Sequence, residues 1–286
     1  MEEKIQNICE ATEAAALYTV IRDGADLAGD GTPGVFKAFL PVKITKEEVL
    51  EQLHKHVGKK LLCPASFKNG IAEALRLTYV PCWVFNGKMV VKYDAVFGID
   101  RAEKDRYGKS KIATDWYPVG GTYVKELDEF SWDSDIASDK DLAGLEPFTS
   151  ADFIAYDGTL PGEAEKAAGI RGMNEAWKDV SAKRKEELPQ ELRERILDDK
   201  HCHRIKELKQ NIAWTGVGYT HALVPVWIYR REFRGKTYAV MANGETGSLS
   251  GVTPMSPGKL AAAAAAVLAV LAGIAFAVKF ILSLFA

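Results

Sequence analysis

The sequence predicts an α+β protein with two related antiparallel-sheet halves, a helical insertion between them and one C-terminal transmembrane helix. Three observations support this prediction: a Pro-x-Trp segment that recurs 144 residues further along, a charged helical run between the two copies, and an apolar end. We expect five parts: an N-terminal helix and Gly/Asp-rich linker (1–34), a first β-rich half (35–160), the insertion (161–202), a second β-rich half (203–258) and a membrane anchor (259–286).

The first part is expected to contain a short helix over residues 2–17 and then a linker, because residues 23–34 are rich in Gly and Asp. Residues 36–44 alternate well enough for a strand. The pattern Thr45-Lys-Glu-Glu48 is a capping box, and it predicts a helix that ends near Val57.

Residues 75–136 are rich in β-branched and aromatic residues, which favours strands. Asn86-Gly87 is typical of a two-residue hairpin turn, and we expect it to join strand 80–85 to strand 88–97.

Residues 162–200 are rich in Glu, Lys, Arg and Ala, with opposite charges three or four residues apart, as in solvent-exposed helices. Pro189 is expected to open a second helix there. Strands should follow over residues 205–215, 219–231, 237–243 and 248–252.

The recurring segment indicates that the two halves are related. Tyr79-Val-Pro-Cys-Trp-Val-Phe85 matches Leu223-Val-Pro-Val-Trp-Ile-Tyr229. Proline is found in strands only at starts, edges or bulges. Pro81 with Trp83, and Pro225 with Trp227, therefore indicate a strand that bends at proline and buries its tryptophan. Chance similarity between two amphipathic strands is the alternative.

The C-terminal run Leu260–Val278 contains 19 residues without a charge, between Lys259 and Lys279. A helix of this length spans about 28 Å, close to the hydrocarbon thickness of a bilayer. The residues expected to hold it in the membrane are Leu260, Val267, Leu268, Leu271, Gly273, Phe276 and Val278. Small residues at four-residue spacing, Gly273 among them, would allow association with another helix in the membrane. A buried core helix is the alternative.

Charge and cysteine content indicate where the body lies. The chain has 37 basic and 39 acidic side chains, a poor balance for binding nucleic acid. The first residues lack a basic start and an apolar core, so we expect no signal peptide. The four cysteines form no C-x-x-C pair, which favours free thiols in a reducing compartment. We therefore expect a single-pass protein of the cell membrane whose body faces the cytoplasm.

No catalytic, metal or cofactor motif is found in the sequence. His201 and His203 would share one face of a strand, but no third ligand at a recognised spacing completes a metal site. The chain has no P-loop, Gly-x-Ser-x-Gly, His-Glu-x-x-His or Gly-x-Gly-x-x-Gly. We accordingly expect no enzyme activity, no cofactor and no metal.

Asn243-Gly-Glu-Thr-Gly247 is expected to form a tight turn, since Asn and Gly tolerate positive φ and Thr can bond the turn backbone. A ligand-binding loop is the alternative. The residues concerned are Asn243, Gly244, Thr246 and Gly247.

This turn, the preceding Pro-x-Trp strand and the apolar end resemble a bacterial membrane-protein family often labelled PriA-helicase-like or TFIIB-type zinc-ribbon. Residues 39–44 and 79–85 also resemble its pattern. Members of that family begin with a zinc ribbon of paired C-x-x-C motifs, which this chain lacks. The resemblance implies membrane attachment and, as in some members, association with SPFH (flotillin-like) or phage-shock-protein-A-like partners in envelope stress.

These features together favour a tail-anchored adaptor or scaffold that faces the cytoplasm and binds protein partners at the membrane. One alternative is a membrane-tethered enzyme that uses His201 and His203 with an acidic partner. Another is a lipid- or envelope-sensing module.

Overall fold

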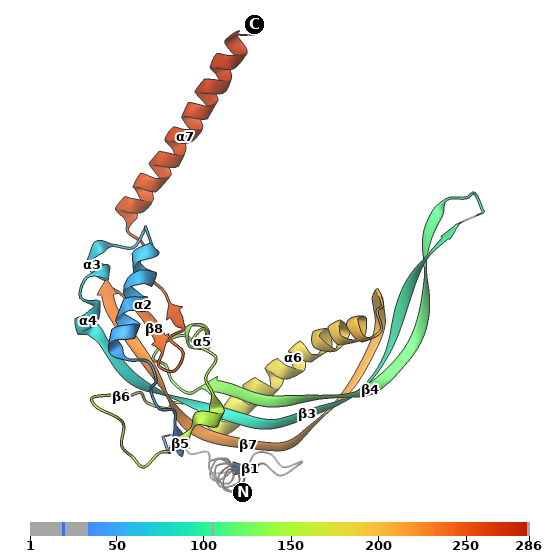
Figure 1. Ribbon diagram of the computed structural model, residues 1–286, viewed down its shortest axis with the longest axis horizontal. Coiled ribbons are helices and arrows are strands. Elements are labelled where there is room, and N and C mark those ends of the chain that lie inside the picture. Colours follow the sequence, from blue (N-terminus) through green and yellow to red (C-terminus); the bar gives the residue numbers. More distant parts are fainter. Residues whose placement is uncertain (1–18, 21–33, 105, 285–286) are drawn as a thin grey trace, which may run out of the picture.

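The computed structural model describes residues 19–20, 34–104 and 106–284. The helix expected over residues 2–17 and most of the expected linker lie outside the described residues. The described chain is a mixed α/β body with a strongly curved sheet, from which one long helix projects (Figure 1).

Three long strands form the framework of the sheet: β3 (Leu75–Lys104), β4 (Ser110–Trp132) and β7 (Arg204–Phe233). β3 lies between β4 and β7 and is antiparallel to both. The shorter strands pair around them and are β1 (Thr19–Val20), β2 (Ala38–Phe39), β5 (Ile154–Ala155), β6 (Glu165–Lys166), β8 (Lys236–Asn243) and β9 (Leu249–Gly251).

The hairpin expected at Asn86-Gly87 is wrong, because β3 runs through these residues without a turn. The register between β3 and β7 shifts between Asn86 and Lys88, which makes a β-bulge. Gly87 has φ 145°, and a Cβ there would lie 2.8 Å from Val217 Cα. The glycine thus permits a close approach of two strands instead of a chain reversal. The break expected between strands 205–215 and 219–231 is also absent, because β7 continues through these residues and stays paired with β3 across the bulge.

Two helices cover one face of the sheet. α2 (Lys46–Lys59) begins with the expected capping box, in which the Thr45 hydroxyl accepts from Glu48 N and the Glu48 carboxylate accepts from Thr45 N. α6 (Met173–Asp199) is one helix that contains Pro189, so the second helix expected there is wrong. Burial of Leu188 and Leu192 against the sheet offsets the backbone hydrogen bond that proline removes. The shorter helices are α3 (Ala65–Lys68), α4 (Ile71–Ala74), α5 (Asp139–Ala143) and a 3₁₀ turn (Ser150–Asp152).

The two Pro-x-Trp segments lie side by side at the centre of the sheet. Val80 pairs with Val224, the matching residue of the other segment, so the two segments run antiparallel around this pair. Trp83 lies against α6 in one hydrophobic cluster, and Trp227 lies with the residues of α2 in another. Both tryptophans are buried, as their segments predicted.

Corresponding hydrogen bonds surround the two segments. Trp83 Nε1 donates to Arg171 O and Trp227 Nε1 donates to Ile44 O, both at 3.1 Å. Each carbonyl belongs to the residue two positions before its helix, α6 or α2. On the other side, Asp133 N donates to Pro81 O at 3.0 Å, and Gly244 N donates to Pro225 O at 2.8 Å.

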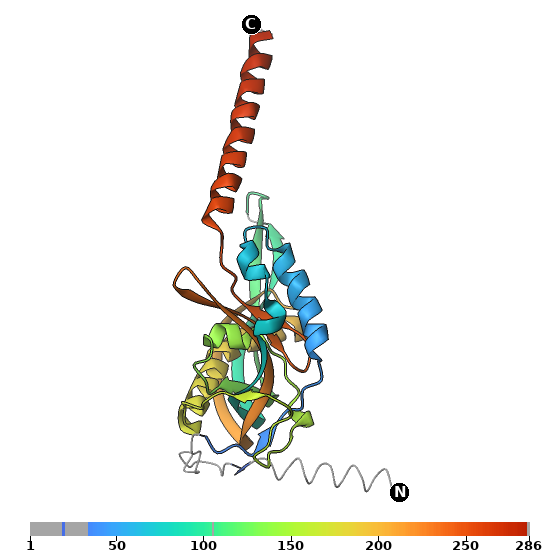
Figure 2. The ribbon, with the colours of Figure 1, turned by 90° about the vertical axis from the view of Figure 1, so that its left-hand side faces the viewer.

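The long C-terminal helix is α7 (Pro257–Leu284), and it projects from the body in both views (Figures 1 and 2). Its segment Pro257–Phe276 has a mean hydropathy of 2.2, and none of it is buried against the rest of the chain. The alternative of a buried core helix is therefore wrong. α7 is long and apolar enough to cross a membrane.

Candidate functional site

The Asn243–Gly247 segment forms the turn between β8 and β9 and docks onto the core. Asn243 is fully buried, and its Nδ2 donates to Leu145 O and Pro147 O, both at 2.9 Å. Its Oδ1 accepts from Glu245 N and Thr246 N. These four bonds use the whole hydrogen-bonding capacity of the amide. Asn243 therefore holds the turn, and no polar atom of its side chain is left for a ligand.

Two glycines make the same turn possible. A Cβ on Gly244 would lie 2.7 Å from Pro225 Cβ, so only glycine lets the turn rest on the proline of the second Pro-x-Trp segment. Gly247 has φ 78°, a left-handed conformation. Thr246 has a local role, because its hydroxyl donates to Ser248 Oγ at 3.0 Å.

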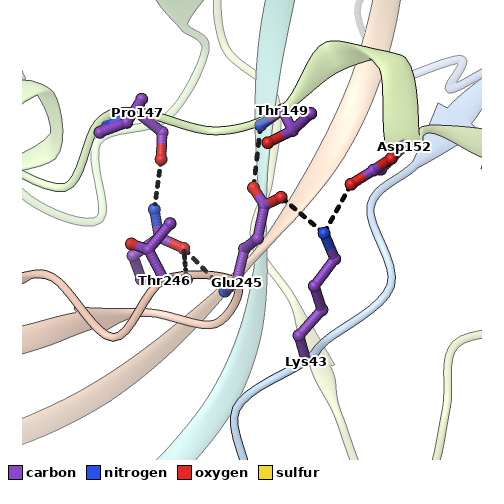
Figure 3. A network of polar contacts seen from close by, with 7 residues as sticks. Lys43, Pro147, Thr149, Asp152, Glu245 and Thr246 are labelled. Atoms are coloured by element: carbon purple, nitrogen blue, oxygen red, sulfur yellow. Dashed lines mark hydrogen bonds and ion pairs between the residues drawn. The ribbon is translucent and has the colours of Figure 1, made fainter.

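A polar network joins this turn to two other segments (Figure 3). Lys43 Nζ donates to Asp152 Oδ2 at 2.5 Å and to Glu245 Oε1 at 2.8 Å, while Glu245 Oε2 accepts from Thr149 N at 2.8 Å. Burial opposes ionisation of Glu245, but the hydrogen bonds from Lys43 and Thr149 outweigh it and hold the pKa of the carboxyl below its usual value. The bond to Asp152, followed by that to Glu245, raises the pKa of Lys43. The network is a charged clamp between three segments.

A buried His–Asp pair lies beside the first Pro-x-Trp segment. His221 Nε2 lies 2.8 Å from Asp133 Oδ2, and both side chains are almost fully buried. Asp133 Oδ1 accepts from Ile170 N and Arg171 N. The imidazole stacks on Trp83 with ring centroids 3.9 Å apart. The pair is enclosed, and it ties β7 to the segment before α6.

No local pattern in the sequence indicates this pair. His221 and Asp133 are 88 positions apart, and neither lies in a motif. The pairing of β3 with β7 brings the two residues together, because it places Trp83 opposite His221.

His201 and His203 are both exposed. His203 Nδ1 accepts from Asp100 N at 3.2 Å, and His201 has φ 47° at the end of α6. Among the described residues, no group of three His, Cys, Asp or Glu side chains could hold a metal ion.

The base of α7 is joined to the body and surrounded by basic and apolar side chains. Ser256 N donates to Leu62 O at 2.8 Å, and Lys259 Nζ donates to Cys63 O at 2.8 Å. Lys59 and Lys60 are exposed nearby, and Leu61 is 82% exposed. We call Lys59, Lys60, Leu61, Met255 and Lys259 the collar.

The expected anchor residues with described side chains all lie on α7 and are exposed: Leu260, Val267, Leu268, Leu271, Gly273, Phe276 and Val278. An exposed apolar surface of this extent marks a site of contact with another protein or a membrane. This exposed apolar surface begins directly after the collar.

Comparison with models of known protein families, with curated proteins and with solved structures finds no match to this chain. The family resemblance of the sequence therefore stays a prediction.

Proposed function

We propose that this protein is a membrane-anchored adaptor: α7 crosses the bilayer, the body lies on the cytoplasmic side, and the sheet binds a protein partner. The observation that carries the proposal is the wholly exposed apolar surface of α7. The collar supports the orientation, because Lys and Arg next to a membrane helix favour the cytoplasmic side.

The outer edge of β4 is the surface best suited to a protein partner. β4 contains 23 residues, and among the described strands only β3 pairs with it. A long unpaired edge presents free N–H and C=O groups that an extended segment of another protein can bind as an added strand. The sequence resemblance favours SPFH or phage-shock-protein-A-like proteins as the class of partner.

We also infer that the body consists of two related β-α-β-β units. The first contains β2, α2, β3 and β4, and the second contains β6, α6, β7 and β8. The paired Pro-x-Trp segments and the corresponding tryptophan bonds support this inference. In this arrangement α6 is the counterpart of α2 and belongs to the second unit. Residues 161–202 are then part of that unit and not an insertion between two halves.

Membrane anchoring is tested with Leu268→Arg in the full chain. An arginine at the centre of a membrane helix costs about 2.5–3.5 kcal/mol. Because the anchor is rich in alanine, we expect the variant to leave the membrane on alkaline carbonate washing, whereas the parent and Leu268→Ala stay. A parent chain that washes off, or a body that protease reaches only from outside the cell, would refute the proposal.

Partner binding is tested with a photo-reactive amino acid in place of Val124, which is half exposed on β4. Irradiation of intact membranes should link the chain to a defined protein. A photo-reactive residue in place of Thr159, on the loop between β5 and β6, is the control. Equal labelling at both positions would argue against the β4 edge.

A further inference from the structure

The β3–β4 ribbon extends beyond the rest of the sheet. The last residue of β3 that pairs with β7 is Gly98, opposite Arg204, whereas β3 and β4 stay paired as far as Lys104 and Ser110. Among the described residues, the end of the ribbon therefore consists of two strands without a third strand or a helix against them. A bare two-stranded ribbon is marginally stable in water. We call residues 101–112 the tip, of which all but residue 105 are described.

The tip combines cations with exposed apolar side chains. Residues 103–112 contain four Lys or Arg and two Asp or Glu, although the whole chain has a formal charge of −2. Tyr107 is 77% exposed and Ile112 is 67% exposed. The Arg106 guanidinium lies 5.2 Å from the centre of the Tyr107 ring. Aromatic and basic side chains together are typical of surfaces that lie in the headgroup region of a membrane.

The ribbon curves toward the side of the body from which α7 projects. Figures 1 and 2 both show the tip at the height of the first turns of α7, and Figure 1 shows it well apart from that helix. The bonds of Ser256 and Lys259 to the segment before α3 hold the base of α7 on the body. The collar and the tip thus form two basic, partly apolar patches on the same side of the molecule.

We propose that the tip is a second membrane contact, in which Tyr107 and Ile112 enter the headgroup region of the bilayer that α7 crosses, and Lys104, Arg106, Lys109 and Lys111 lie against anionic phospholipids. The inference rests on the proposed anchoring by α7. With one contact at the collar and another at the tip, the body lies along the membrane and the β4 edge is held close to its surface.

The test uses the full chain reconstituted in vesicles of phosphatidylcholine, with or without phosphatidylglycerol. A photo-reactive benzoylphenylalanine replaces Tyr107, and in a control chain it replaces Thr159. Thr159 belongs to the loop between β5 and β6, and this loop lies on the side of the body away from α7 (Figure 1). We expect a lipid adduct at position 107 that is strongest with phosphatidylglycerol and decreases in high salt, and little adduct at position 159.

A matched pair of triple variants tests the charges. Each cation at an anionic surface contributes about a fivefold factor in binding. Changing Lys104, Lys109 and Lys111 to Gln should therefore lower the adduct yield at position 107 by about tenfold or more. The control changes Lys88, Lys92 and Lys209 to Gln, which are also exposed but lie on the sheet away from the tip. This control should leave the yield unchanged.

The outcomes separate the two proposals. If the chain resists carbonate but position 107 gives no lipid adduct, or gives the same yield in both vesicle types, the tip contact is wrong and the anchoring stands. If position 107 links to a protein in native membranes instead of lipid, the tip is a protein-binding surface. If carbonate extracts the chain, the anchoring itself fails.

Discussion

At the residue scale, two buried acceptors each hold the segment that leads into a helix, one before α2 and the other before α6. The carbonyl of Gly244 accepts from Lys43 N and Ile44 N, and the carboxylate of Asp133 accepts from Ile170 N and Arg171 N. Each acceptor fixes the chain just before a helix that covers a tryptophan. In the first case the turn around Asn243 positions the acceptor, and in the second case His221 does.

Asn243→Ala should destabilise the protein by about 3 kcal/mol, because two carbonyls and two N–H groups lose their partner in a buried turn. Chemical denaturation of the full chain in detergent measures this change. Thr246→Ala, at the exposed side of the same turn, should cost less than about 1 kcal/mol. Equal effects of the two substitutions would contradict a structural role for the Asn243 amide.

The Lys43–Glu245 clamp should make stability depend on pH. Since the folded-state pKa of Glu245 is below its ordinary value of 4.5, its contribution is present above that value and is lost as the pH falls through the folded-state pKa. Glu245→Gln should therefore be less stable than the parent at pH 7, and the difference should decrease in acid. Denaturation of both chains between pH 7 and pH 3 measures it, and a difference that grows in acid would contradict the sign.

At the scale of elements, the long strands depend on irregularities that let them continue. β3 and β7 stay paired across a bulge in which Gly87 approaches the backbone of Val217. The part of the β3–β4 ribbon that carries the tip lies beyond this bulge. The conformation at Gly87 therefore determines whether the far half of the ribbon stays on the same sheet as the Pro-x-Trp core.

Gly87→Ala should destabilise the chain by at least about 2 kcal/mol, because its Cβ would meet backbone atoms that cannot move aside. Gly58→Ala is the control. Gly58 lies inside α2 with nothing within 4 Å of the added Cβ, so alanine there should stabilise by up to about 1 kcal/mol. Thermal unfolding of the two variants should show shifts of opposite sign.

At the scale of the whole molecule, the chain has a packed centre with two extensions, α7 and the ribbon tip. The centre contains both Pro-x-Trp segments and the helices that cover them. In the part of the chain that the structure describes, neither a third strand nor a helix lies against the tip. Stability should accordingly fall from the centre outward along β3.

Hydrogen exchange of the full chain in detergent should show this gradient. Amides of residues 79–85 and 223–229 should exchange slowest, and those of the tip fastest, since local opening is easiest where few contacts are buried. Slow exchange at the tip without a bilayer would contradict the gradient and show a structured contact there.

The sequence by itself determined the local features of this protein. The Thr45 capping box and the turn at Asn243 follow from patterns a few residues long, and α7 follows from one continuous apolar run; each is found in the structure. The match between the two Pro-x-Trp segments also showed that both tryptophans would be buried, because a strand with this composition needs a covered face.

Other features require residues that are far apart in the chain, and they form only in the folded structure. Asn86-Gly87 is a turn sequence by local preference, but pairing with both neighbouring strands carries β3 straight through it. Likewise Pro189 should end a helix, but packing of its neighbours on the sheet continues it. Lys43 and Glu245 are 202 positions apart, and no local rule joins them. Their contact, like the position of the ribbon tip on the side of α7, exists because the folded sheet brings distant segments together.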